Sequence, residues 1–220
     1  MSSTWRVETA TGTAQELHDR PFTWARTVAR CEVTRPALVL GSTQQEPPPL
    51  PTGVELARRR SGGGAVLVTP GGQLWLDVDV PAGDDLWDHD VGRSFWWLGD
   101  AWARALADVG VGEAVVHRGG LERRPWSSQV CFAGLGPGEV TVGRRKVVGI
   151  SQRRWREGAR FHCAALLTWD PVAVVAALGL PDEAATDVAM TAMAVDPAIA
   201  DDLVQAFLRY AAAPCSSSTD

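Results

Sequence analysis

The chain has 220 residues, of which 45% are hydrophobic and 21% are charged, as expected for a globular protein of about one domain. Its formal net charge of −5 argues against general nucleic-acid binding, and no apolar run approaches the roughly 20 residues that a membrane-spanning helix needs. The N-terminus has no basic segment followed by an apolar one, so no signal peptide is expected. Four widely spaced cysteines predict reduced thiols and a cytoplasmic location.

The first part of the chain predicts short helices followed by strands. Thr13 and Glu16 form a capping-box pair at a helix start. Four prolines within residues 44–51 exclude regular structure and indicate a surface loop. Before residue 81, apolar residues alternate with polar ones such as Asp77 and Asp79, the pattern of a half-buried strand. The expected helices are 13–20 and 24–31, and the expected strands are 36–41, 54–59, 65–69 and 73–80.

The second part predicts a long helix, a run of strands and two final helices. Apolar residues recur at helical spacing up to Gly110, which ends the long helix, and Pro171 suits a first helical turn. Helices are expected at 90–109, 170–178 and 197–212, and strands at 114–117, 129–132, 139–142, 146–152 and 159–169. This loose alternation predicts an α+β (α/β) fold, with a mixed, largely antiparallel sheet flanked by helices. We expect one domain over residues 1–212 and a disordered tail at 213–220.

One candidate binding motif is the segment Arg58-Arg-Arg-Ser-Gly-Gly-Gly-Ala65, which lies between two predicted strands. Consecutive glycines cost conformational entropy, but they let backbone N–H groups approach an anion. The arginines add positive charge at the same place. A flexible hairpin turn with solvated arginines is the alternative interpretation.

A second candidate is Lys146, the only lysine among the 21 lysines and arginines of the chain. An ammonium group is compact and can neutralise a carboxylate, a phosphate or a developing oxyanion where guanidinium would not serve. A strand-end lysine in a basic turn is the alternative. Between Arg118 and Arg160 there are ten basic and three acidic residues, which indicates an anion site, an acidic partner or a solvated basic face.

Together, Arg58–Val66 and Gly143–Ser151 resemble motifs of the family of lipoate–protein ligases, octanoyltransferases and biotin–protein ligases, and most of all those of lipoate–protein ligase A. A third segment, Arg160–Leu167, is similar to the His-His segment of the ligases, with Cys163 in place of the second histidine. The resemblance covers about residues 5–210. It implies the ligase catalytic domain.

The same resemblance implies the reaction. Lipoate is activated with ATP and Mg²⁺ to lipoyl-AMP, and the lipoyl group passes to a lysine of a partner. The partner is the lipoyl domain of a 2-oxoacid dehydrogenase or a glycine-cleavage carrier protein, with no nucleic acid or membrane involved. Lys146 is implied as the catalytic residue, no metal-ligating residue is implied, and Trp75 and Trp155 are candidates for an acyl tunnel. The implied acyl-adenylate-binding residues are Arg59, Ser61, Gly62, Gly63, Gly64, Gly149, Ser151 and His162.

Two departures from the ligase pattern keep other functions open. Residues 128–133 replace an Asn-Asp pair of the ligases, and their Cys131-Phe132 resembles the octanoyltransferase branch. Cys131 would then carry the acyl group as a thioester, unless it is an apolar filler residue. The chain also ends soon after the expected catalytic domain. A separate accessory subunit is one explanation, and transfer without adenylation or lost activity are the others. Use of biotin or another small acid, and a non-catalytic acyl- or partner-binding role, also stay open.

Overall fold

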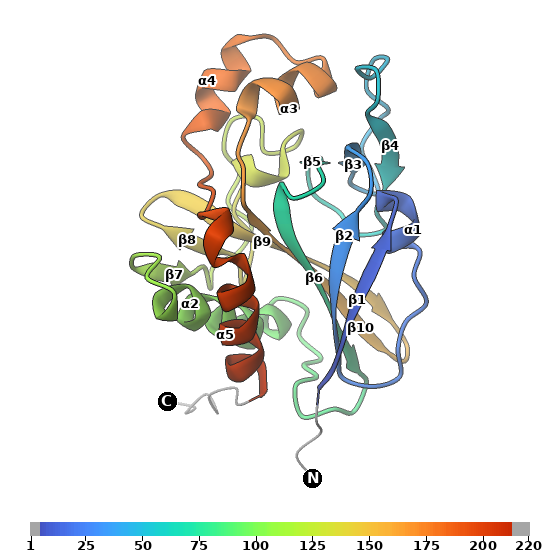
Figure 1. Ribbon diagram of the computed structural model, residues 1–220, viewed down its shortest axis with the longest axis vertical. Helices are drawn as coiled ribbons and strands as arrows, with labels where there is room; N and C mark the ends of the chain where they lie inside the picture. The colour runs from blue at the N-terminus through green and yellow to red at the C-terminus, as the bar shows by residue number, and fades with distance from the viewer. Residues whose placement is uncertain (1–4, 213–220) are drawn as a thin grey trace.

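The structure is a computed structural model that describes residues 5–212, so the tail expected at 213–220 lies outside the described residues (Figure 1). Its centre is a seven-stranded sheet with the order β1-β2-β6-β10-β9-β8-β7. Only the β1–β2 pair of this sheet is parallel, so the predicted mixed, largely antiparallel sheet is confirmed. The bounds are β1 (Arg6–Gly12), β2 (Thr27–Val33), β6 (Gln73–Pro81), β7 (Ala114–Val116), β8 (Val140–Val142), β9 (Arg145–Trp155) and β10 (Gly158–Leu166).

Two long helices, α2 (Trp96–Asp108) and α5 (Ala200–Ala212), cover one face of this sheet (Figure 1). Short 3₁₀ turns, η1 (Arg93–Phe95) and η3 (Pro197–Ile199), lead into them. The apolar stripe of each helix packs with alternate residues of β6, β9 and β10 in the largest core cluster. Trp102 of α2 and Phe207 of α5 pack against each other in this cluster, with ring centroids 4.6 Å apart.

The opposite face of the sheet carries a second, smaller sheet and the first helix. The small sheet has the order β4-β3-β5, with β3 (Ala37–Leu40) parallel to β4 (Glu55–Arg58) and antiparallel to β5 (Val66–Val68). Helix α1 (Ala14–His18) starts at the predicted capping box, where Thr13 Oγ accepts from the Glu16 N–H and the Glu16 carboxylate accepts from the Thr13 N–H. Apolar residues of α1, β2 and the small sheet share a core cluster.

Two further helices lie at the outer side of the small sheet, α3 (Pro171–Leu178) and α4 (Glu183–Ala189) (Figure 1). Helix α3 begins as predicted, with the Asp170 side chain accepting from the Ala173 N–H and with Pro171 in the first turn. Helix α4 was not expected from the sequence. Within residues 5–212, no helix is long and apolar enough to cross a membrane.

Two expectations about local structure are wrong, and one strand was not expected. Residues 27–31 of the expected 24–31 helix belong to strand β2, because this segment pairs with β1 on one side and β6 on the other. Strand β1 was not predicted because it is an edge strand with mostly polar side chains. Strand β6 is buried along almost its whole length rather than half-buried, because other elements cover both of its faces.

The strand expected at 129–132 is also wrong. A single bridge joins Val130 to Ala65, and a short 3₁₀ helix, η2 (Cys131–Ala133), follows at once. The chain turns here because Phe132 and Ala133 pack inward. This turn places Cys131 and Phe132 beside the small sheet.

Candidate functional site

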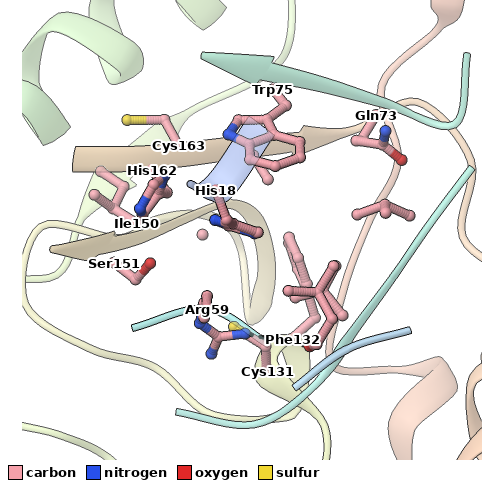
Figure 2. A pocket seen from close by; sticks show the side chains of 15 residues that line it. His18, Arg59, Gln73, Trp75, Cys131, Phe132, Ile150, Ser151, His162 and Cys163 are labelled. Carbon is pink, nitrogen blue, oxygen red and sulfur yellow. Dashed lines mark hydrogen bonds between the residues drawn. The ribbon is translucent and has the colours of Figure 1, made fainter. Parts of the chain in front are cut away.

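A pocket lies between the two sheets, on the face of the large sheet opposite α2 and α5 (Figure 2). Its walls are mostly apolar and come from β3, β5, β6, β9, β10 and η2. Polar side chains interrupt this apolar lining at a few points. They are His18, Arg59, Gln73, Cys131, Ser151 and His162.

The glycine-rich loop that follows β4 contributes Arg59 to the pocket lining and is ordered by its own contacts. The Arg59 guanidinium is buried and donates to the carbonyl oxygens of Gly62 and Gly64 at 2.8 and 2.7 Å. A Cβ on Gly64 would lie 2.6 Å from the Val130 carbonyl carbon, and a Cβ on Gly41 would lie 2.0 Å from the Gly63 oxygen. Glycine is therefore required at these two positions by close backbone approach. The loop is not a freely flexible turn.

This loop meets strand β9 through a hydrogen bond between two hydroxyl groups. Ser61 Oγ donates to Ser151 Oγ at 3.0 Å, although the two residues are 90 positions apart in the sequence. Gly149 lies two residues before Ser151 on the same face of β9, where a Cβ would come within 3.3 Å of the Phe132 ring. The two motifs singled out in the sequence therefore form walls of the same pocket.

A row of polar residues crosses the floor of the pocket. Asp77, His162 and Ser151 are register neighbours on β6, β10 and β9. The His162 Nδ1 and Asp77 Oδ1 atoms lie 2.6 Å apart, and the Trp75 indole donates to the same oxygen at 2.7 Å. Burial raises the pKa of Asp77, but His162 and Arg160 outweigh burial and lower it to about 2. Asp77 is therefore an anion that fixes the orientation of the His162 ring.

His18 completes this floor from helix α1. Its ring centroid lies 4.6 Å from that of Trp75 and 4.8 Å from that of His162 (Figure 2). Among the described residues, its Nδ1 atom is buried without a hydrogen-bond partner. Burial, with a smaller contribution from His162, holds the pKa of His18 well below its ordinary value. The ring is therefore neutral at pH 7.

Lys146 does not line the pocket. Its Nζ atom donates to Glu139 Oε2 at 2.9 Å and to the Cys131 carbonyl oxygen at 2.6 Å, and 2% of the residue is exposed. The ring of Phe132, which does line the pocket, has its centroid 5.0 Å from Nζ. The Glu139 carboxylate also accepts from the N–H groups of Gly136 and Ile150. Phe132 thus separates a buried ion pair from the pocket.

Cys131 contributes a thiol to the pocket lining and is half-buried (Figure 2). Its N–H donates to the Ala65 carbonyl oxygen at 2.9 Å, which ties η2 to the end of the glycine loop. Its position therefore combines a free thiol with access to the same space as Arg59 and His162.

Residues 15–197 match the model of the lipoyl protein ligase A/B catalytic domain family. This match spans most of the chain. The protein belongs to this family. The resemblance stated from the sequence motifs is confirmed.

Solved structures share this ligase fold. Lipoate-protein ligase A bound with ATP is 18% identical with a TM-score of 0.67, over 96% of this chain and 84% of that chain. The T. acidophilum protein Ta0514 with bound lipoic acid is 16% identical with a TM-score of 0.67, over the same shares of the two chains. A bipartite lipoate protein ligase studied with its E2 lipoyl domain, from Thermoplasma acidophilum, is 19% identical with a TM-score of 0.68, over 94% and 82%. A search of curated proteins found no match.

The structure gathers most of the predicted site residues of this ligase-family chain but not all. Arg59, Cys131, Gly149, Ser151 and His162 line the pocket. Ser61 bonds to Ser151, and Gly62 and Gly64 accept hydrogen bonds from Arg59, but Gly62–Gly64 do not themselves line the pocket. Lys146 lies behind Phe132. Of the two tryptophans proposed for a tunnel, Trp75 lines the pocket, whereas Trp155 packs against Phe22 and Arg153 at the far end of β9.

Sequence reasoning missed His18, Asp77 and Glu139 as site residues. Asp77 alternates with apolar neighbours, which favours a solvent-facing position when the strand is considered by itself. The sequence signal that could have found it is the pair Asp77 and Asp79 within one strand. If both faces of the sheet are covered, both carboxylates are buried and need partners. Within residues 5–212, no group of three His, Cys, Asp or Glu residues is arranged to hold a metal ion.

The basic segment 118–160 does not form one surface. Lys146 and Arg160 are buried in ion pairs with Glu139 and Asp79. Arg145 and Arg153 lie eight residues apart along β9, which is about 27 Å of extended chain. The positive charge of this segment is therefore divided between two separate regions rather than gathered in a continuous one.

Proposed function

We propose that this protein activates lipoate, or a closely related acid, with ATP and transfers the acyl group to a lysine of a lipoyl domain. The observation that carries the proposal is the Ser61–Ser151 contact, which joins the glycine loop to the lysine-bearing strand at one apolar pocket. Membership of the ligase A/B family supports it, and so do structures of the same fold with ATP and with lipoic acid. The similar archaeal ligase studied with its E2 lipoyl domain supports the choice of partner.

In the activation step, a carboxylate oxygen attacks the α-phosphate of ATP and pyrophosphate leaves. The two reactants are anions, so the step needs cationic groups and aligned donors. Arg59 contributes a guanidinium to the pocket lining and also orders residues 62–64 through their carbonyl oxygens. The backbone N–H groups of this loop would supply the further donors. The apolar lining would hold the acyl chain and keep water from the acyl-adenylate. Mg²⁺ would enter with the phosphates of ATP.

In the transfer step, the acceptor amine attacks the acyl carbonyl carbon. The bond to the phosphate oxygen breaks, AMP leaves, and the amine loses a proton. Lys146 would stabilise the negative charge that develops on the carbonyl and phosphate oxygens. For its Nζ atom to reach them, the Phe132 ring must move aside, because it covers this ammonium group on the pocket side.

Acyl transfer through Cys131 is the second candidate, and the position of the thiol on the pocket lining favours it. In that reaction the Cys131 thiolate attacks an acyl thioester and the carrier thiol leaves. The acceptor amine then attacks the new thioester and releases the Cys131 thiol. No nucleotide is consumed.

One experiment separates the two reactions. Acyl-adenylate formation from lipoate, ATP and Mg²⁺ is measured in a single turnover, followed by transfer to an unmodified lipoyl domain. The double variant Lys146→Met/Glu139→Gln removes the ammonium without leaving an unpaired buried carboxylate, which a single change would do. We expect it to lose about 100-fold in adenylate formation while keeping the native circular dichroism spectrum.

The same two steps are measured for the variant Cys131→Ser, which is expected to retain both adenylation and transfer. The ligase proposal fails if the unaltered protein forms no adenylate. It is replaced by the transferase if an octanoyl thioester then acts as donor and Cys131→Ser abolishes that transfer.

A further inference from the structure

A cluster of aromatic and arginine side chains lies at the end of β9, outside the pocket. We call Phe22, Trp24, Arg60, Arg153 and Trp155 the aromatic–arginine patch. Trp24 is 72% exposed, and the Phe22 ring lies 5.8 Å from that of Trp24 and 5.2 Å from that of Trp155. The Arg153 guanidinium lies 4.2 Å from the Trp155 ring centroid. Tryptophan and arginine are the residues most enriched at binding hot spots.

This patch is continuous with the candidate site. Side chains alternate along a strand, so Arg153 and Trp155 continue the face of β9 on which Ser151 lines the pocket. Trp155 lies four residues beyond Ser151, about 13 Å along the strand. Arg59 lines both the pocket and an open surface groove that Asp19, Ser42, Arg58 and Arg60 also line. A group bound at the patch therefore lies next to the groove that shares Arg59 with the pocket.

The charge of the patch is only weakly compensated. Within residues 5–212, Arg153 forms no ion pair, and Arg60 has one long contact of 4.0 Å with Asp19. Partial burial and the nearby Arg60 lower the pKa of Arg153. Two guanidinium groups that repel each other are stabilised by an incoming carboxylate.

The aromatic part of the patch is held in place before anything binds. The Arg160 guanidinium donates to the carbonyl oxygens of Arg20 and Pro21 at 2.9 and 2.8 Å, just before Phe22. A Cβ on Gly158 would lie 2.5 Å from the Phe22 ring, so the ring packs directly on this backbone. Such an ordered surface loses little conformational entropy on association.

We propose that the aromatic–arginine patch binds the acyl acceptor, a small folded domain with an acidic surface that presents the lysine to be modified. The inference rests on the proposed function and assigns its partner a binding surface. Carboxylates of the domain pair with Arg60 and Arg153, and its apolar contacts cover Trp24 and Phe22. Its lysine then extends along the face of β9 toward Ser151 and the pocket.

The test compares the Michaelis constant for an unmodified lipoyl domain with single-turnover acyl-adenylate formation. Trp24→Ser and Arg153→Ser are each expected to raise the Michaelis constant for the domain by about fivefold or more and to leave adenylate formation unchanged. Arg145→Ser at the opposite end of β9 and Met190→Ser, at another exposed side chain, are matched controls. Both are expected to change the constant by less than about twofold.

An unchanged Michaelis constant in both patch variants overturns the inference. A loss of adenylate formation as large as the rise in the Michaelis constant also overturns it. If the unaltered protein forms no adenylate, the proposed function fails separately, and calorimetric titration with the same lipoyl domain decides the binding surface. Affinity that falls about fivefold in the patch variants supports the inference. No binding to the domain, or binding to anionic lipid vesicles in its place, contradicts it.

Discussion

Charged side chains inside this protein are paired between different elements of the fold. Asp77 on β6 contacts His162 on β10, and Lys146 on β9 contacts Glu139 just before β8. A buried charge without a partner costs several kcal/mol, so each pair also fixes the position of its two elements. The single lysine of the chain is accordingly placed where one ammonium group serves a carboxylate and a carbonyl oxygen together.

At the same scale, His18 makes the stability of the protein depend on pH. The pKa of His18 is lowered in the folded state, so below about pH 6.5 the unfolded chain binds a proton that the folded chain does not. The contribution of the buried, neutral His18 ring to the unfolding free energy is therefore fully present above that pH and decreases as the pH falls. We expect His18→Gln to flatten the decline of the unfolding free energy between pH 7 and 5 by up to about 1.4 kcal/mol per pH unit.

Urea unfolding at several pH values measures this effect. His89→Gln, which changes an exposed histidine, is the matched control and is expected to keep the slope of the unaltered protein. Equal slopes for His18→Gln and the unaltered protein would show that His18 is protonated in the folded state.

Among the elements, the glycine loop shows how backbone packing determines the shape of the site. Three of its glycines look equivalent in the sequence, yet their surroundings differ. A Cβ at Gly64 meets the backbone of Val130, whereas a Cβ at Gly62 meets no atom within 4 Å. Gly63 has a φ of +96°, which L-residues rarely adopt.

This difference predicts unequal effects of the same substitution. Gly64→Ala is expected to lower the unfolding free energy by about 2 kcal/mol or more, because neither backbone segment can yield easily. Gly62→Ala, the matched control, is expected to change it by less than about 0.5 kcal/mol. Urea unfolding compares the two variants, and similar losses would mean that the loop is not packed against Val130.

On the scale of the whole molecule, the two faces of the large sheet have different roles. One face packs with α2 and α5 into the largest core, and the other face bears the pocket. Neighbouring residues of one strand serve the two faces in turn. On β10, Phe161 packs in the core while His162 lines the pocket.

The separation predicts that damage to the core leaves ligand recognition intact. Phe207→Ala deletes a fully buried ring that packs against Trp102, and it is expected to lower the unfolding free energy by about 3–5 kcal/mol. The affinity of the remaining folded protein for lipoate is expected to be unchanged, as measured by calorimetry below the unfolding temperature. A parallel loss of affinity would show that the two faces are coupled.

The sequence by itself determined much of this architecture. The apolar periodicity that ends at Gly110 identified α2, because a long amphipathic helix carries its own burial pattern. The pattern of residues 73–80 identified β6 as a strand but not its burial on both faces. The glycine loop and the strand of Lys146 identified the family and two walls of the site. Short or polar strands such as β1 gave no such local signal.

Only the tertiary structure decided which groups meet. Residues 27–33 form a strand because two neighbours pair with them, and Cys131 lies on a 3₁₀ turn because Phe132 packs inward. The burial of Asp77 likewise depends on strand β10, whose His162 is 85 residues away in the chain. The local sequence pattern shows which side chains are apolar and predicts which of them are buried. The hydrogen-bond partner of a buried polar atom depends instead on how distant elements pack.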